Sequence, residues 1–106
     1  MDAKTRKHLE RAGFAVGGAA DFLGLSAEEA ALVEMRLALS RALRERRAAA
    51  GLTQTGLARL TGSSQSRVAK MEAGDPSVSL ELLIRALLAA GASRREVGQA
   101  LARKVA

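Results

Sequence analysis

The sequence predicts an all-α fold, and three observations support this prediction. Alanine and leucine are abundant while proline occurs once, so helix-favouring residues dominate the chain. Only Phe14 and Phe22 are aromatic, so the core has to be built from aliphatic side chains and methionine. Serine or threonine repeatedly stands directly before a run with helical apolar spacing, as at the start of a capped helix. A chain of 106 residues is long enough for one domain with a modest core.

The charge and composition narrow the classes of function. The net charge is +6, from 17 basic and 11 acidic groups. This excess favours a polyanionic partner, although it is also common among soluble proteins. There is no cysteine, so disulfides and thiolate chemistry are excluded. Residues 1–11 carry several charges and no apolar signal segment, and no apolar run approaches the length of a membrane span. We therefore expect a soluble, cytoplasmic protein.

Residues 1–25 are predicted to form a helical N-terminal extension, and residues 26–106 the main domain. Residues 3–12 have an amphipathic helical pattern, and residues 19–25 could add one or two helical turns. We expect this extension to dock onto the next helix through its large apolar side chains, which are Phe14, Phe22 and Leu23. His8, the only histidine, has no neighbour that suggests metal or acid–base chemistry, so we expect it at the surface.

The longest helix is predicted from Ala27 to about Ala50. A capping box opens it, with Ser26 as the N-cap and Glu29 as the N3 residue. Its first half is apolar on two faces, which indicates packing on both sides, by the extension or by a second subunit. The two stripes are Leu32, Met35 and Leu39 on one face and Val33 and Leu37 on the other.

The second half of this helix is basic. In the segment RALRERR, residues 41–47, only Leu43 clearly points inward. The arginines of this segment form either a solvated face or a set of phosphate contacts.

Two short helices joined by a tight turn are predicted between residues 53 and 74. Thr53 and Ser64 are N-cap residue types, and Gly62 can adopt the left-handed conformation that ends the first helix. Four apolar side chains can meet inside this corner: Leu57, Ala58, Val68 and Met71. The polar residues of the second helix then point outward, and they are Gln65, Ser66, Arg67 and Lys70. The polar side chains of this first turn are suited to hydrogen bonds with base edges in a major groove. An ordinary solvated helix surface would show the same pattern.

Two further helices complete the domain. After a loop at residues 75–77, Ser79 caps a helix from Leu80 to Ala90. Five of its residues are expected to close the core: Leu80, Leu83, Ile84, Leu87 and Leu88. A second capping box, Ser93 with Glu96, opens a last helix to about Lys104. Its apolar stripe is Val97, Ala100 and Leu101. Because so short a helix is marginal alone, this stripe must dock within the chain or across a dimer.

The spacing within the corner resembles the helix-turn-helix signature of the Xre family of phage-repressor-like regulators. Counted from Gln54, alanine is fifth, glycine ninth, valine fifteenth and methionine eighteenth. LTQ, SSQSRVAKMEAG and SLELLIRALLAAG resemble three successive family blocks, and the resemblance covers roughly residues 39–92. It implies a five-helix core from Ala27 to about Lys104, and sequence-specific DNA binding by insertion of helix 65–73 into the major groove.

The resemblance also implies roles for individual residues. Gln65 would read a base edge, most naturally of adenine. Gln54 would hold a phosphate through its backbone N–H and side chain and would brace Gln65. Ser66, Arg67 and Lys70 would reach further base edges or phosphates. The full set expected at the DNA is Thr53, Gln54, Ser64, Gln65, Ser66, Arg67 and Lys70.

A structural ion pair of the family corresponds to Arg47 and Glu72 in this chain. This pair would tie the long helix to the end of the recognition helix. Gly56 departs from the family pattern, which has a better helix former at that position. Because glycine inside a helix costs about 1 kcal/mol relative to alanine, we expect the first corner helix to be the less stable of the two.

One module of this kind buries too little surface for tight specific binding, so we expect a homodimer on an inverted-repeat operator. Residues 13–39, placed before an Xre-like core in so short a chain, resemble bacterial antitoxins of the HigA-like type. That likeness implies a repressor that neutralises a toxin and regulates its own operon. The alternatives are a stand-alone phage-like or controller repressor, and a helical interaction module without specific DNA binding.

No enzymatic activity, metal or cofactor is expected. The chain has no cysteine or tyrosine, one histidine and no glycine-rich phosphate loop. The neighbouring carboxylates Glu28 and Glu29 are accounted for by helix capping.

Overall fold

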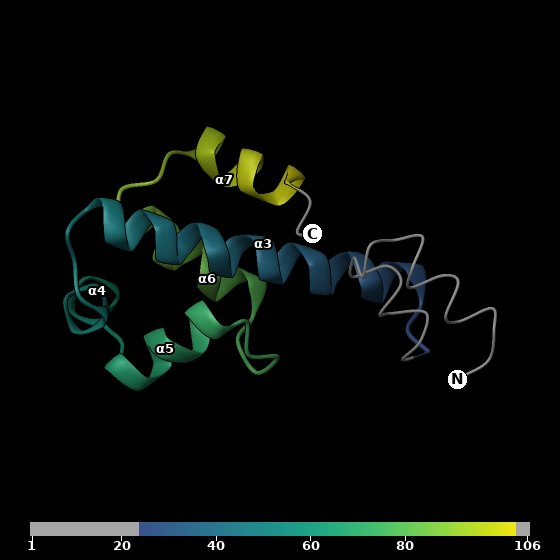
Figure 1. Ribbon diagram of the computed structural model, residues 1–106, viewed down its shortest axis with the longest axis horizontal. Coiled ribbons are helices and arrows are strands. Elements are labelled where there is room, and N and C mark those ends of the chain that lie inside the picture. The colour runs from purple at the N-terminus through teal and green to yellow at the C-terminus, as the bar shows by residue number, and fades with distance from the viewer. Residues whose placement is uncertain (1–23, 104–106) are drawn as a thin grey trace.

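The computed structural model describes residues 24–103, and all regular structure within this range is helical (Figure 1). The helices are α3 (Ala27–Ala49), α4 (Gln54–Thr61), α5 (Gln65–Ala73), α6 (Leu80–Ala89) and α7 (Arg94–Ala102). The predicted all-α fold, with five helices in the main domain, is confirmed. The helices predicted at 3–12 and from residue 19, the docking of Phe14, Phe22 and Leu23, and the site of His8 lie outside the described residues. The division at residues 25 and 26 stays a prediction.

Each of the five helices begins at a hydroxyl side chain that accepts a hydrogen bond from the backbone N–H three residues later. These N-caps are Ser26, Thr53, Ser64, Ser79 and Ser93. Both predicted capping boxes form, and Glu29 and Glu96 accept hydrogen bonds from the backbone N–H groups of Ser26 and Ser93. These hydrogen bonds lower the pKa of each glutamate below its ordinary value. The helix boundaries are therefore set locally by the sequence.

The core lies between α3 and the helices beside it, and it includes side chains of α4 as well (Figure 1). Helix α3 packs against α5, α6 and α7, and α4 packs against α5 and α6. The largest fully buried side chains come from four helices and are Leu39, Leu43, Leu57, Val68, Met71 and Leu83. The four residues predicted to meet inside the corner are all buried. This apolar centre fixes the orientation of α4 and α5 on the long helix.

The prediction that Leu88 closes the core is wrong, because this side chain is 45% exposed. Leu83 and Leu87 of the same helix are buried, while Leu80 and Ile84 are half-buried. The buried stripe of α6 consists of Leu83, Ala86 and Leu87 and continues at Ala90. Successive side chains on an α-helix are separated by about 100°, so Leu88 lies beyond the edge of this stripe.

Helices α4 to α7 leave the first half of α3 partly uncovered, and the predicted partners of its two apolar stripes, the extension or a second subunit, lie outside the described residues. Leu39 is fully buried, but Leu32 is 46% and Met35 is 36% exposed. Val33 and Leu37 are half-buried. Figure 1 shows the reason: the beginning of α3 projects beyond helices α4 to α7, so these four helices cannot cover it.

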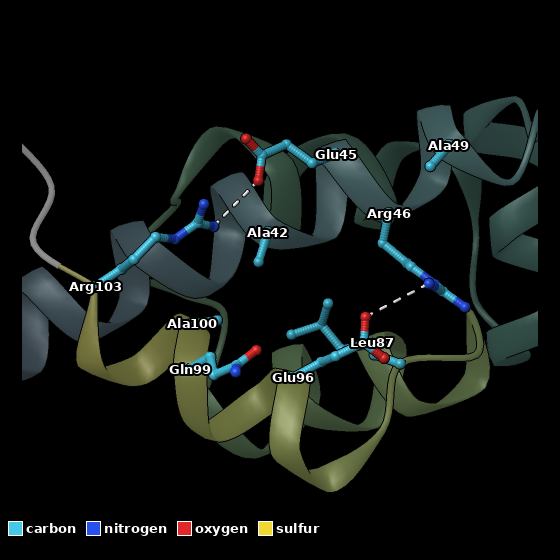
Figure 2. Close-up of a pocket in the computed structure, with 10 residues that line it drawn as sticks. Ala42, Glu45, Arg46, Ala49, Leu87, Glu96, Gln99, Ala100 and Arg103 are labelled. Carbon is cyan, nitrogen blue, oxygen red and sulfur yellow. Dashed lines mark hydrogen bonds and ion pairs between the residues drawn. The ribbon is translucent and has the colours of Figure 1, made fainter.

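Helix α7 docks within the chain, with Val97 and Ala100 buried and Leu101 half-buried. It ends at Ala102, so the predicted end near Lys104 is two residues too late. Ion pairs tie both of its ends to α3, Arg46 with Glu96 at 3.7 Å and Arg103 with Glu45 at 3.1 Å. Figure 2 shows these pairs on either side of a hollow of about 400 Å³ with an alanine-rich lining.

Arg46 has a role that neither interpretation of the basic segment anticipated. Its Nε donates to the carbonyl oxygen of Ala90 at 3.0 Å, and its Nη2 donates to that of Gly91 at 2.8 Å. The carbonyl groups at the end of a helix lack partners within the helix, and a cation there also interacts favourably with the helix dipole. Arg46 therefore links α3 to the junction between α6 and α7.

Candidate nucleic-acid interface

Helices α4 and α5 form a corner through a turn at residues 62–64. Gly62 has φ of 67°, a left-handed conformation that favours glycine, and it ends α4. The backbone N–H of Ser63 donates to the carbonyl oxygen of Ala58 at 2.8 Å, which closes the turn. Ser64 then caps α5. Because the inner face of α5 is packed against α3 and α4, only its outer face is free to meet a partner.

The residues expected at the DNA lie at the surface of this corner. All are exposed apart from Gln54, which is half-buried. The exposed members are Thr53, Ser64, Gln65, Ser66, Arg67 and Lys70. The hydroxyl oxygens of Thr53 and Ser64 accept the capping hydrogen bonds from Gly56 and Arg67, so both residues hold helix termini in place. The outer face of α5 therefore presents an amide, a hydroxyl and two cations to solvent.

The end of α5 is fixed to α3 by Arg47 and Glu72. Arg47 Nε donates to Glu72 Oε2 at 2.5 Å, and Arg47 Nη2 donates to Glu72 Oε1 at 3.0 Å. The third nitrogen of the guanidinium, Nη1, donates to the carbonyl oxygen of Leu52 at 3.0 Å. The hydrogen bonds to Glu72 raise the pKa of Arg47 above its ordinary value. This one arginine thus joins α3 both to α5 and to the segment before α4.

Two glutamines continue this network to the surface. Gln54 Nε2 donates to Glu72 Oε1 at 3.2 Å, and Gln65 Nε2 donates to Gln54 Oε1 at 2.7 Å. The contact between Gln65 and Gln54 is the brace that the family resemblance implied. The contact between Gln54 and Glu72 was missed by the sequence analysis. Gln54 and Glu72 lie on different helices, so no spacing within one helix indicates their contact, and only the crossing of α4 and α5 reveals it.

A hollow of about 160 Å³ lies beside α5. It is lined by Ser64, Ser66, Arg67 and Lys70, and by Ser77 and Val78 of the following loop. Ser77 was not among the predicted site residues, because a serine in a loop has no distinctive spacing. The backbone N–H of Ser77 donates to Asp75 Oδ1 at 2.8 Å, and hydrogen bonds from Ser77 lower the pKa of Asp75. The hydroxyls and cations around this hollow are suited to the oxygens of a phosphate group.

Two further features, a metal centre and a membrane span, concern residues 24–103. No group of three or more histidine, aspartate or glutamate side chains is arranged to hold a metal ion there. None of the described helices is long and apolar enough to cross a membrane.

Comparison with protein families identifies the corner and its surroundings. Residues 38–100 match a family model described as a helix-turn-helix domain. The match begins in the second half of α3 and ends in α7, so it contains α4, α5 and every predicted site residue. Comparison with curated proteins and with solved structures gives no match.

Proposed function

Because the chain belongs to the helix-turn-helix domain family, we propose that it is a sequence-specific transcriptional regulator of the Xre type that inserts α5 into the major groove. The observation that carries this proposal is the contrast between the two faces of α5. Val68, Met71 and Glu72 are buried against the rest of the domain, while Gln65 and Lys70 are exposed. A rigidly held helix with a free polar face can enter a groove without rearranging the core.

Gln65 is the proposed reader of a base. Its Nε2 uses one N–H on Gln54, so the second N–H and Oε1 remain for DNA. A donor and an acceptor on one amide match N7 and N6 of adenine. Ser66 lies next to Gln65 on the same exposed turn and would reach a neighbouring base edge.

The protein would bind the sugar–phosphate backbone on both sides of Gln65. Thr53 and Gln54 lie at the N-terminus of α4, where free backbone N–H groups and the helix dipole favour a phosphate. Arg67 and Lys70, with Ser64 and Ser77, line the hollow beside α5 and would hold another phosphate. Such contacts position the protein on the duplex but carry no sequence information.

Since one domain offers a small contact area, we propose a homodimer on an inverted-repeat operator. The test is selection of duplexes from a randomised library by the full chain, followed by titration of the selected duplex and a scrambled duplex. Enrichment of an inverted repeat, bound at two chains per duplex, supports the proposal. Equal affinity for both duplexes would leave a helical interaction module without specific DNA binding as the better explanation.

We extend the proposal to an antitoxin role, in which the chain neutralises a small toxin and represses their shared operon in the cytoplasm. This role is supported by the resemblance of residues 13–39 to HigA-like antitoxins. The side chains of Leu32 and Met35 add an apolar surface that α4 to α7 leave uncovered. The test is expression of the product of the adjacent gene, alone and together with this chain. Growth arrest that the chain relieves supports an antitoxin, and a harmless neighbour favours a stand-alone repressor.

A further inference from the structure

The hydrogen bonds that lead from α3 to the surface of α5 have a fixed direction. A carboxylate only accepts hydrogen bonds, so the Gln54 amide has to present its NH₂ group to Glu72. The Gln54 carbonyl oxygen then faces Gln65 and can be met only by the NH₂ group of that residue. The charge on Glu72 therefore determines the orientation of two successive side-chain amides, first that of Gln54 and then that of Gln65.

We propose that Glu72 is a positioning residue, which sets the orientation of the Gln65 amide through Gln54 and thereby determines the base that Gln65 prefers. This inference rests on the proposed function of Gln65 as a base reader. A glutamine amide is nearly symmetric in shape, but rotation by 180° exchanges its donor and acceptor. Adenine offers an acceptor at N7 and a donor at N6, so only one orientation of the amide matches both atoms.

The position of Glu72 makes it suited to this role. Its side chain is only 5% exposed, and that of Arg47 is 19% exposed, so the ion pair is largely shielded from water. Oε2 is held by Arg47 Nε, and Oε1 accepts from both Arg47 Nη2 and Gln54 Nε2. Hydrogen bonds to a charged group are stronger than those between neutral groups, so this end of the network is the fixed one. Gln65, at the other end, is exposed and depends on Gln54 for its orientation.

The change Glu72→Gln tests the direction of the network while keeping the size of the side chain. Because both oxygens of Glu72 accept from Arg47, the new amide would present its NH₂ group to one Arg47 nitrogen in either orientation, so it no longer fixes which group faces Gln54. Gln54 would then have no fixed orientation, and Gln65 would no longer be held as the donor to it. The duplex selected by the wild-type chain is titrated beside its single A·T-to-G·C variants. At the base pair that Gln65 contacts, the preference for A·T should fall by about tenfold.

A swapped pair distinguishes orientation from a purely structural effect. In the double variant Glu72→Gln with Gln54→Glu, the NH₂ group at position 72 faces a carboxylate at position 54. A carboxylate can only accept hydrogen bonds, so Gln65 has to donate to it through its NH₂ group, and the original orientation of Gln65 returns. The preference for A·T should recover, although the negative charge now stands at position 54, at the proposed DNA surface, and lowers affinity for every duplex. Unfolding in urea measures separately how far the new carboxylate, which lies near Arg47, restores stability.

Unfolding curves in urea establish which of the variants are folded. A third variant tests the network without changing the ion pair. Gln54→Met interrupts the network without touching Arg47 or Glu72, and it should also reduce the preference about tenfold. Gln99→Met, on the exposed face of α7, is the matched control and should leave the preference for A·T unchanged. Wild-type preference retained in both Glu72→Gln and Gln54→Met overturns the positioning role of Glu72. It is also overturned if the swapped pair fails to recover the preference. If the wild-type chain itself selects no duplex, the proposed function fails instead.

Discussion

Arg47 in α3 holds Glu72 in α5 through two hydrogen bonds, of 2.5 and 3.0 Å, across 25 residues of sequence. The same glutamate accepts from Gln54 at the start of α4. One ion pair therefore joins α3 to α4 and α5, the two helices that form the proposed DNA-binding surface. Because most of the pair is buried, removal of one partner leaves the other charge without compensation.

Glu72→Ala should accordingly destabilise the protein by about 3–5 kcal/mol, as expected for breaking a buried pair. Arg47→Ala should have a similar effect, and the double variant should be less destabilised than the sum of the two. The measurement is the free energy of unfolding in urea for all four members of a double-mutant cycle. Additive changes in the free energy of unfolding would show that the two side chains are not energetically coupled.

The adjacent leucines of α6 provide a second test. Leu87 is 3% exposed and Leu88 is 45% exposed, so the same substitution should have different effects. Leu87→Ala should cost about 2–5 kcal/mol, because it leaves a cavity in the core. Leu88→Ala should stay within about 0.5 kcal/mol of the wild type. Thermal and urea unfolding of both variants measure this difference, and a large effect at Leu88 in a dimer would place that residue in a subunit interface.

Local signals predicted most of this fold. The serine and threonine N-caps, the two capping boxes and Gly62 each act within a few residues, so the helix boundaries could be inferred from the sequence. The prediction that Leu88 closes the core was wrong because Leu88 was assigned to the same face as Leu83 and Leu87, although the buried stripe of α6 follows Leu83, Ala86 and Leu87. The degree of burial depends on where α3 and α4 lie, and no pattern within α6 contains that information.

The candidate site was predicted less completely. The outward residues of α5 followed from its amphipathic pattern, since residues that cannot enter the core have to face solvent. The link from Gln54 to Glu72, the carbonyl contacts of Arg46 and the position of Ser77 beside α5 join segments that are distant in sequence. Such contacts arise from the crossing of helices, and composition and periodicity do not encode them.

The capping boxes predict that the stability of the protein depends on pH in the acidic range. The pKa of Glu96 is lowered in the folded protein, first by the backbone N–H of Ser93. Because the folded pKa is lower than the unfolded one, this stabilisation is fully present above the ordinary pKa of a glutamate. It is lost as the pH falls through the folded pKa. Glu96→Gln should therefore be less stable than the wild type at pH 7, and the difference should shrink on acidification.

Thermal unfolding of both proteins between pH 7 and pH 3, taken as about the range that spans the carboxyl pKa, measures this effect. Glu81→Gln is the matched control, because Glu81 is exposed and lies in the first turn of α6, where it has only a contact with Arg85. A stability difference for Glu96→Gln that persisted unchanged at pH 3 would mean that the charge of Glu96 does not stabilise α7.

Gln65 and Lys70 separate the reading of bases from the positioning of the protein. Gln65→Ala should cost about 1–3 kcal/mol on the selected duplex and much less on a scrambled one, so specificity falls. Lys70→Ala should weaken binding to both duplexes by similar factors. It should also reduce the slope of log K against log salt concentration by about one, because one fewer phosphate is neutralised.

Titrations of both duplexes across a range of salt concentration measure these two effects. Helix α7 supplies the matched controls, since it packs on the side of α3 away from α5 (Figure 1). Gln99→Ala and Arg94→Ala remove an exposed amide and an exposed cation there and should leave affinity, specificity and salt slope unchanged. If Gln65→Ala lost affinity equally on both duplexes, Gln65 would be a phosphate contact or a support for Gln54. If binding did not depend on salt at all, the insertion of α5 between two phosphate backbones would be excluded, because such a fit has to displace counterions.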